Sequence, residues 1–168
     1  MANKASFTPE EWTKVLESVA VTGMAVTAAE PSGLFGMLKE AFAGGAAVAA
    51  AKADPNANEL VKAAVADFER ADGRASVQEA LKARFADAKP TDVVPRALDT
   101  LRQATAILDT KAPSDAPAFK AWLNAIAQKV AEAAKEGGFL GFGGVQVSDA
   151  EKATLAQIAS ALGITKPA

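Results

Sequence analysis

Residues 119–133 read FKAWLNAIAQKVAEA and carry the most regular helical pattern in the chain. Apolar residues recur there at intervals of three and four, the spacing that places side chains on one face of an α-helix. The segment opens at Ser114-Asp115 and closes at Glu136-Gly137-Gly138. It therefore predicts a long amphipathic helix whose inward face carries Phe119, Trp122, Leu123, Ile126, Val130 and Ala133.

The same spacing recurs along the rest of the chain and predicts about seven helices in all. They are expected near residues 8–29, 33–53, 55–73, 77–89, 91–108, 114–136 and 148–163. We find no convincing strand, because the alternating Val145-Gln146-Val147 is short and has no partner. The sequence thus predicts a single-domain, all-α bundle over residues 1–168, with the helices at 8–29 and 114–136 as its central pair.

Several helix ends carry recognisable signals. Thr8-Pro9-Glu10-Glu11 and Ser148 with Glu151 have the form of capping boxes. Gly163 followed by Ile164 is typical of a left-handed helix end with its hydrophobic contact. Other expected boundaries are a stop near Asp72-Gly73 and a cap at Thr91 or Asp92.

The two ends of the chain resemble each other. A shift of 107 residues places Trp12 on Phe119, Leu16 on Leu123 and Phe35 on Phe142. Each half, 8–53 and 114–164, reads as a helix, a Gly/Phe loop and a further helix. The match predicts a pseudo-twofold internal repeat, although alanine-rich helices also produce matches of this kind by chance.

The composition argues against catalysis, because the chain has no His, no Cys and no Tyr. The commonest general acid–base residue and the thiol nucleophile are therefore missing. Serine and threonine are weak nucleophiles without a base. We expect a non-enzymatic protein with no catalytic residues and no cofactor.

Charge and hydropathy indicate a soluble protein. The formal net charge is −2 and basic residues alternate with acidic ones, so we expect no nucleic-acid partner. The longest weakly polar run, residues 41–51, is far shorter than the roughly 20 residues of a membrane span. The absence of cysteine and of an apolar N-terminal leader fits a cytoplasmic location.

The Gly/Phe segment 137–144 is the most unusual part of the chain. Its glycines permit tight turns, and Phe139, Leu140 and Phe142 most simply plug the end of the bundle. Two alternatives are an exposed interaction surface made by these three residues and a backbone nest for an anion. The shorter Gly33-Leu34-Phe35-Gly36 invites the same interpretation.

The remaining side chains that could carry chemistry have structural interpretations. Asp67, Glu69 and Asp72 are expected to lie near a helix end without forming a cation loop. Trp12 and Trp122 lie on apolar stripes, so we expect both in the core.

One family resemblance lies in the C-terminal third. Phe119-Lys120-Ala121-Trp122-Leu123, Glu136-Gly137 and the later Ser148-x-x-Glu151 resemble the helix–loop–helix unit of TerB-like proteins, which are associated with tellurite resistance and stress responses. The resemblance implies an all-helical bundle in which acidic residues around an Ala-Asp-Gly element bind metal. Here Glu136-Gly137 replaces Asp-Gly, so the implied metal residues are Glu136 and Glu151, helped by Asp149.

Three hypotheses about function follow. The leading one is an interaction or scaffold protein that binds an unknown protein partner or a second copy of itself. Its contact surfaces would be Phe139, Leu140 and Phe142, together with the low-bulk tract 41–53. The alternatives are a TerB-like module that binds a divalent cation and a carrier of a small apolar ligand held between helices.

Overall fold

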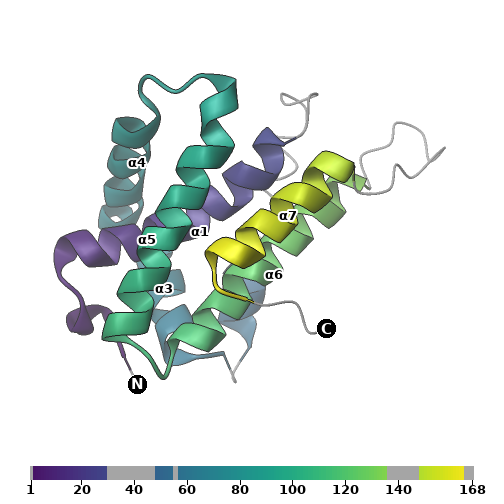
Figure 1. The fold of residues 1–168 in the computed structure, drawn as a ribbon. Coiled ribbons are helices and arrows are strands. Elements are labelled where there is room, and N and C mark those ends of the chain that lie inside the picture. The colour runs from purple at the N-terminus through teal and green to yellow at the C-terminus, as the bar shows by residue number, and fades with distance from the viewer. Residues whose placement is uncertain (1, 30–47, 55–56, 136–147, 165–168) are drawn as a thin grey trace.

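All regular structure in the described part of the chain is helical (Figure 1). The computed structural model describes residues 2–29, 48–54, 57–135 and 148–164. Residues 48–53 are also helical, and no strand occurs in these ranges. The predicted all-α bundle is therefore confirmed, with the elements η1 (Lys4–Ser6), α1 (Pro9–Ala28), α3 (Glu59–Glu69), α4 (Ala71–Phe85), η2 (Pro90–Asp92), α5 (Val93–Lys111), α6 (Ala116–Lys135) and α7 (Asp149–Ala161).

Helix α1 is the centre of the bundle, but its main partner differs from the expected one. It packs most extensively against α5 and only then against α6. Figure 1 shows α5 crossing α1, while α7 lies alongside α6. The sequence pattern missed this arrangement because Ser18 and Thr22 are also buried, which widens the buried face beyond the apolar stripe. Each hydroxyl donates to a carbonyl of its own helix, that of Val15 and of Ser18 respectively, so neither is unpaired in the core.

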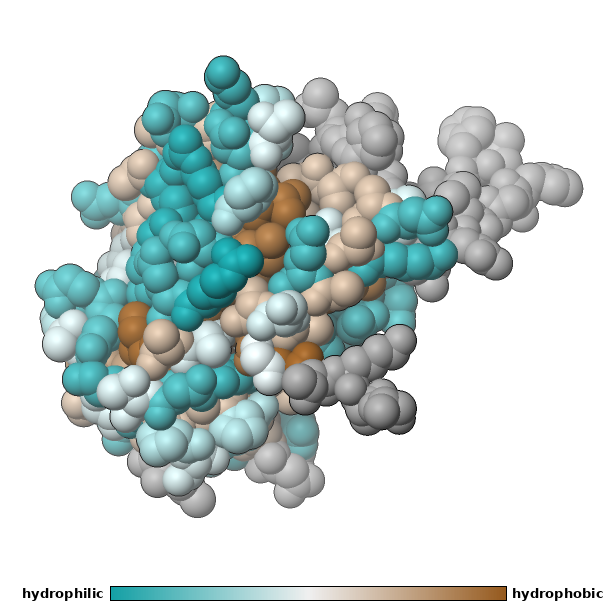
Figure 2. Space-filling model, in the orientation of Figure 1, coloured by the Kyte–Doolittle hydropathy of each residue, from teal (hydrophilic) through white to brown (hydrophobic). Residues whose placement is uncertain are grey.

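The predicted apolar stripes form one continuous core. Trp12 is 3% exposed, and Phe119, Leu123, Ile126 and Val130 are between 0 and 2% exposed. Polar residues cover most of the outer surfaces of α4 and α5, whereas hydrophobic residues show in the seam between α5 and α7 (Figure 2). No described helix combines the length and hydropathy needed to cross a bilayer.

The predicted helix ends are confirmed at three places. The Thr8 hydroxyl accepts from the Glu11 amide at 3.2 Å, and the Ser148 hydroxyl accepts from the Glu151 amide at 3.1 Å. In both cases the glutamate carboxylate accepts from the amide of the capping residue, which completes the box. Gly163 has φ of 67°, and the Ile164 amide donates to the Ala159 carbonyl at 2.9 Å. These contacts form a Schellman motif at the end of α7.

The expected helix stop at Asp72-Gly73 is wrong. Helix α3 already ends at Glu69, and Asp72-Gly73 lies in the first turn of α4. A Cβ atom built on Gly73 would lie 2.1 Å from the Asp67 carbonyl oxygen, so the glycine permits a close approach between the two helices. Gly73 therefore allows the sharp α3–α4 junction rather than ending a helix.

The expected cap of the fifth helix is confirmed in its position, because Asp92 is the N-cap residue of α5. Asp92 precedes α5 but makes no side-chain hydrogen bond to its first turn. Its carboxylate accepts from the Lys89 amide at 3.0 Å and so closes η2 instead. The predicted internal repeat stays a prediction, because the Gly/Phe segments of both halves lie outside the described residues.

Candidate binding groove

A groove of about 280 Å³ lies between one face of α6 and the chain that leads into α3. Apart from Asp54, Asn58 and Lys129, its lining is apolar. Much of that lining is alanine, so the walls leave a space that larger side chains would fill. The lining residues are Ala50, Ala51, Asp54, Ala57, Asn58 and Val61 on one wall and Ala118, Trp122, Ala125, Ile126 and Lys129 on α6.

Asn58 joins the two walls at one end of the groove. Its side-chain oxygen accepts from the Leu60 amide at 2.9 Å and caps α3. Its side-chain nitrogen donates to Asp115 Oδ1 at 2.8 Å, immediately before α6 begins. Asp115 Oδ2 accepts from the Ala2 amide at 2.6 Å. One buried carboxylate therefore holds the N-terminal segment, the start of α3 and the start of α6 together.

Asp115 is expected to make the stability of the fold sensitive to acid. The hydrogen bond from the Ala2 amide, followed by that from Asn58, lowers the pKa of Asp115 and outweighs the opposing effect of burial. A lowered pKa in the folded state contributes stability above the unfolded pKa, which is about 3.9 for aspartate. That contribution is lost as the pH falls through the folded pKa.

Urea unfolding of the wild type and of Asp115→Asn, at a series of pH values from neutral to acidic, checks this expectation. The stability difference between the two proteins should shrink as the pH falls below about 4, because the unfolded wild type then takes up a proton at Asp115 while the folded state still resists it. The shrinkage ends below the folded pKa, where both proteins carry a neutral side chain at position 115. A difference that stays constant through this range would show that ionisation of Asp115 does not stabilise the fold.

Trp122 lines the groove and was expected in the core. It is only partly buried, and its ring meets Phe119 edge-on at a centroid distance of 5.3 Å. The indole nitrogen itself is buried and has no hydrogen-bond partner within the described structure. A buried N–H without an acceptor costs about 1–3 kcal/mol. The Trp122 N–H thus contributes no hydrogen bond to the fold.

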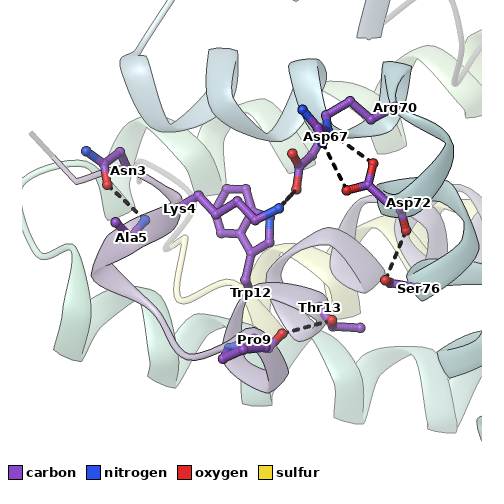
Figure 3. Close-up of polar contacts among 10 residues, drawn as sticks. All are labelled: Asn3, Lys4, Ala5, Pro9, Trp12, Thr13, Asp67, Arg70, Asp72 and Ser76. Atoms are coloured by element: carbon purple, nitrogen blue, oxygen red, sulfur yellow. Dashed lines mark hydrogen bonds and ion pairs between the residues drawn. The ribbon is translucent and has the colours of Figure 1, made fainter.

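Trp12 differs from Trp122, because its indole N–H donates a hydrogen bond to a carboxylate. The indole Nε1 donates to Asp67 Oδ2 at 2.7 Å, and Lys4 Nζ reaches the same oxygen at 2.7 Å (Figure 3). Asp67 lies on α3 and is 7% exposed. The contact therefore links η1, α1 and α3 through one carboxylate oxygen.

Matched Trp→Phe substitutions are expected to show how much the hydrogen bond of Trp12 contributes to stability, because the N–H of Trp122 makes no such bond in the described structure. Trp12→Phe removes a hydrogen bond to a charged acceptor and should lower the free energy of unfolding by about 2 kcal/mol. Trp122→Phe removes an N–H that has no partner and should cost less than about 1 kcal/mol. Urea unfolding followed by circular dichroism measures both variants. Equal losses would mean that the hydrogen bond to Asp67 adds no stability.

Each carboxylate near the end of α3 contacts a neighbouring side chain. Asp67 holds Trp12 and Lys4, whereas Asp72 pairs with Arg70 at 3.0 Å. Figure 3 shows the two carboxylates engaged with different partners. Glu69 forms a third, separate pair with Lys52. The three acids therefore do not converge on a common site.

Of the residues implied by the TerB-like resemblance, the described structure places Asp149 and Glu151, which lie in different surroundings. The Asp149 side chain is exposed and pairs with Lys152, whereas Glu151 is 3% exposed and completes the cap of α7. Glu151 Oε1 has no partner in the described structure. Within the described ranges, no three acidic side chains form a group that could hold a metal ion. Glu136, Phe139, Leu140 and Phe142 lie outside the described residues.

A buried carboxylate on α1 was missed by the sequence analysis. Glu17 comes directly after Leu16, a residue of the apolar stripe of α1. The Glu17 side chain is 1% exposed. Arg84 Nε of α4 donates to Glu17 Oε1 at 2.5 Å, and Lys14 Nζ donates to Oε2 at 2.7 Å. The sequence offered one sign that Glu17 is buried, namely that its neighbours in the chain are apolar. The same pattern also occurs where an acidic residue lies at the solvent-exposed edge of a helix. We regard this ion-pair network as structural.

The sequence analysis predicted only part of the groove. The low-bulk tract 41–53 was a predicted contact surface, and its described end contributes Ala50 and Ala51 to one wall. The opposite wall follows from the 3.6-residue period, because positions 118, 122, 125, 126 and 129 lie on one face of α6. Sequence alone does not show that two faces from distant segments oppose each other.

Comparison with family models, curated proteins and solved structures found no match for this chain.

Proposed function

We propose that this protein is a non-enzymatic binding module that holds a small apolar ligand in the groove between residues 50–54 and 57–61 on one side and α6 on the other. The observation that carries the proposal is the groove itself, in which a partly exposed tryptophan faces a wall built largely of alanine. Small-molecule sites are typically concave and mostly apolar, with a few polar groups that orient the ligand. The groove has this character, with Asp54, Asn58 and Lys129 as the polar groups.

The size of the groove favours a small ligand over a protein surface. Its volume of about 280 Å³ lies just below the usual range for ligand sites, roughly 300–1,000 Å³. A helix or loop of a protein partner would need a longer contact face to reach a stable interface. A ligand with a short apolar chain or a single ring system fits the space better.

The composition supports a role without catalysis. The chain has no His and no Cys, and the groove has Asp54 and Lys129 as its ionisable groups. Interaction through Phe139, Leu140 and Phe142 remains a prediction, because these residues lie outside the described part of the chain. The TerB-like hypothesis gains no support from Asp149 and Glu151, which face different surroundings.

Native mass spectrometry on freshly purified protein tests the proposal. The wild type is expected to carry the added mass of a small molecule, or to take up the neutral apolar dye Nile red when it is supplied. Ala125→Trp should abolish both, because the larger side chain fills the groove from α6. Ala106→Trp on α5 is the matched control, since Ala106 is exposed and does not line the groove.

A wild type that binds neither a native molecule nor Nile red would contradict the proposal. So would binding that Ala125→Trp leaves unchanged, because the ligand would then lie elsewhere. Both variants need a circular dichroism spectrum like that of the wild type before they are compared.

A further inference from the structure

The polar groups of the groove are distributed unevenly, and this distribution points to a class of ligand. We propose that the groove selects a single-chain amphiphile whose anionic head group lies at Lys129 and whose apolar chain lies along Trp122. The inference rests on the proposed function, since it names the ligand of the same site.

The geometry of α6 separates the cation from the apolar wall. Lys129 follows Trp122 by seven residues, which is two helical turns or about 10 Å along the axis. Ala125 and Ile126 lie between them on the same face and line the groove. The α6 wall of the groove is therefore apolar along Trp122, Ala125 and Ile126 and carries a positive charge at Lys129. Such a wall is complementary to an apolar chain with a negative charge at one end.

Lys129 is available for such a head group. Its side chain is exposed, and it forms no ion pair with any residue that the structure describes. Asp54 on the facing wall is a carboxylate that takes part in an interaction of its own. A carboxylate beside Lys129 would form a charge-assisted hydrogen bond, the stronger kind of polar contact.

The other end of the groove offers no comparable site for an anion. Asn58 already donates to Asp115 and accepts from the Leu60 amide. The neighbouring carboxylate of Asp115 is negatively charged and would repel an anionic head group. Lys129 is the cation among the residues that line the groove, so it sets the direction of the ligand, with its head group toward the C-terminal part of α6.

Titration calorimetry with three single-chain probes tests the inference. The probes are dodecanoate, neutral dodecanol and cationic dodecyltrimethylammonium, each used below the concentration at which it aggregates. We expect dodecanoate to bind most tightly and the cation most weakly. Binding should also change the tryptophan fluorescence of the wild type, and this change should disappear in Trp122→Phe.

Charge reversal locates the head group. Lys129→Glu is expected to weaken dodecanoate binding by about tenfold while dodecanol binding stays nearly unchanged. Lys152→Glu is the matched control, because it makes the same charge change at an exposed position on α7 that does not line the groove. Equal weakening by both variants would indicate a long-range charge effect and overturn the inference.

The failure of this inference differs from the failure of the proposed function. If all three probes bind equally and Ala125→Trp abolishes their binding, the groove is a binding site without charge selection. The head-group assignment is then wrong while the proposed function stands. If no probe binds and Nile red does not bind either, both are overturned.

Discussion

Replacement of Arg84 by methionine is expected to lower the free energy of unfolding by about 3–5 kcal/mol, a large part of the stability of a small domain. Arg84 donates to Glu17, whose carboxylate is 1% exposed between α1 and α4. Removing the guanidinium leaves a buried negative charge with Lys14 as its remaining partner. Urea unfolding followed by circular dichroism gives the free energy directly.

A double variant separates the two parts of this effect. Glu17→Leu combined with Arg84→Met removes both charges, and we expect it to recover most of the stability lost by Arg84→Met alone. Buried ion pairs often add little net stability, because both charges must leave water, whereas an unpaired buried charge is costly. A single variant as stable as the wild type would mean that Lys14 alone compensates Glu17.

Gly73→Ala is expected to lower the free energy of unfolding by about 3 kcal/mol, at the upper end of the usual cost of overpacking. The added Cβ would lie 2.1 Å from the Asp67 carbonyl oxygen and 2.8 Å from the carbonyl carbon. Both atoms belong to the backbone, so the α3–α4 junction must shift to make room. Such a shift also moves Asp67, which holds Trp12 and Lys4.

Gly23→Ala is the matched control. At Gly23, on α1, the nearest atom to a new Cβ is Val130 Cγ2 at 4.0 Å, an ordinary contact distance. Alanine favours a helix over glycine by about 1 kcal/mol, so this variant should be as stable as the wild type or slightly more stable. Urea unfolding and the near-ultraviolet dichroism of the tryptophans report stability and packing together. Equal stability of the two variants would contradict the predicted clash at Gly73.

Local signals predicted much of the fold. The boxes at Thr8 and Ser148 and the left-handed end at Gly163 involve residues a few positions apart, so the sequence carries all the information they need. Amphipathic stripes such as Phe119, Leu123 and Ile126 were likewise predicted correctly as buried. Each of these predictions needs only the sequence of a single helix and of the residues at its ends.

The errors arose where a side chain serves a distant element. Gly73 resembles a residue that ends a helix. In the structure it lies within α4, and its lack of a side chain lets the Asp67 carbonyl of α3 approach closely. Asp115 precedes α6 as expected, but the local pattern gave no sign that its carboxylate is bonded to Ala2 and Asn58. Glu17 could not be assigned to the core, because its partner Arg84 lies 67 residues away.

The candidate groove was the least predictable part. Alanine at positions 118 and 125 fits equally well in a closely packed helix pair and in an open groove. Only the placement of residues 50–54 and 57–61 opposite α6 distinguishes the two cases. The partial exposure of Trp122 follows from that same placement.

The bonds of Asp115 also have a consequence for how the chain is made. The partners Ala2 and Asp115 are separated by 113 residues, and Asn58 and Asp115 by 57. A ribosome synthesises both donors long before it adds the acceptor that they share. The bonds of Ala2 and Asn58 to Asp115 must therefore wait for residue 115 to emerge, since contacts between distant residues form late. The contacts of Lys4 and Trp12 with Asp67 need only the first 67 residues, so η1, α1 and α3 can be joined before the N-terminal segment and the start of α3 are tied to the start of α6.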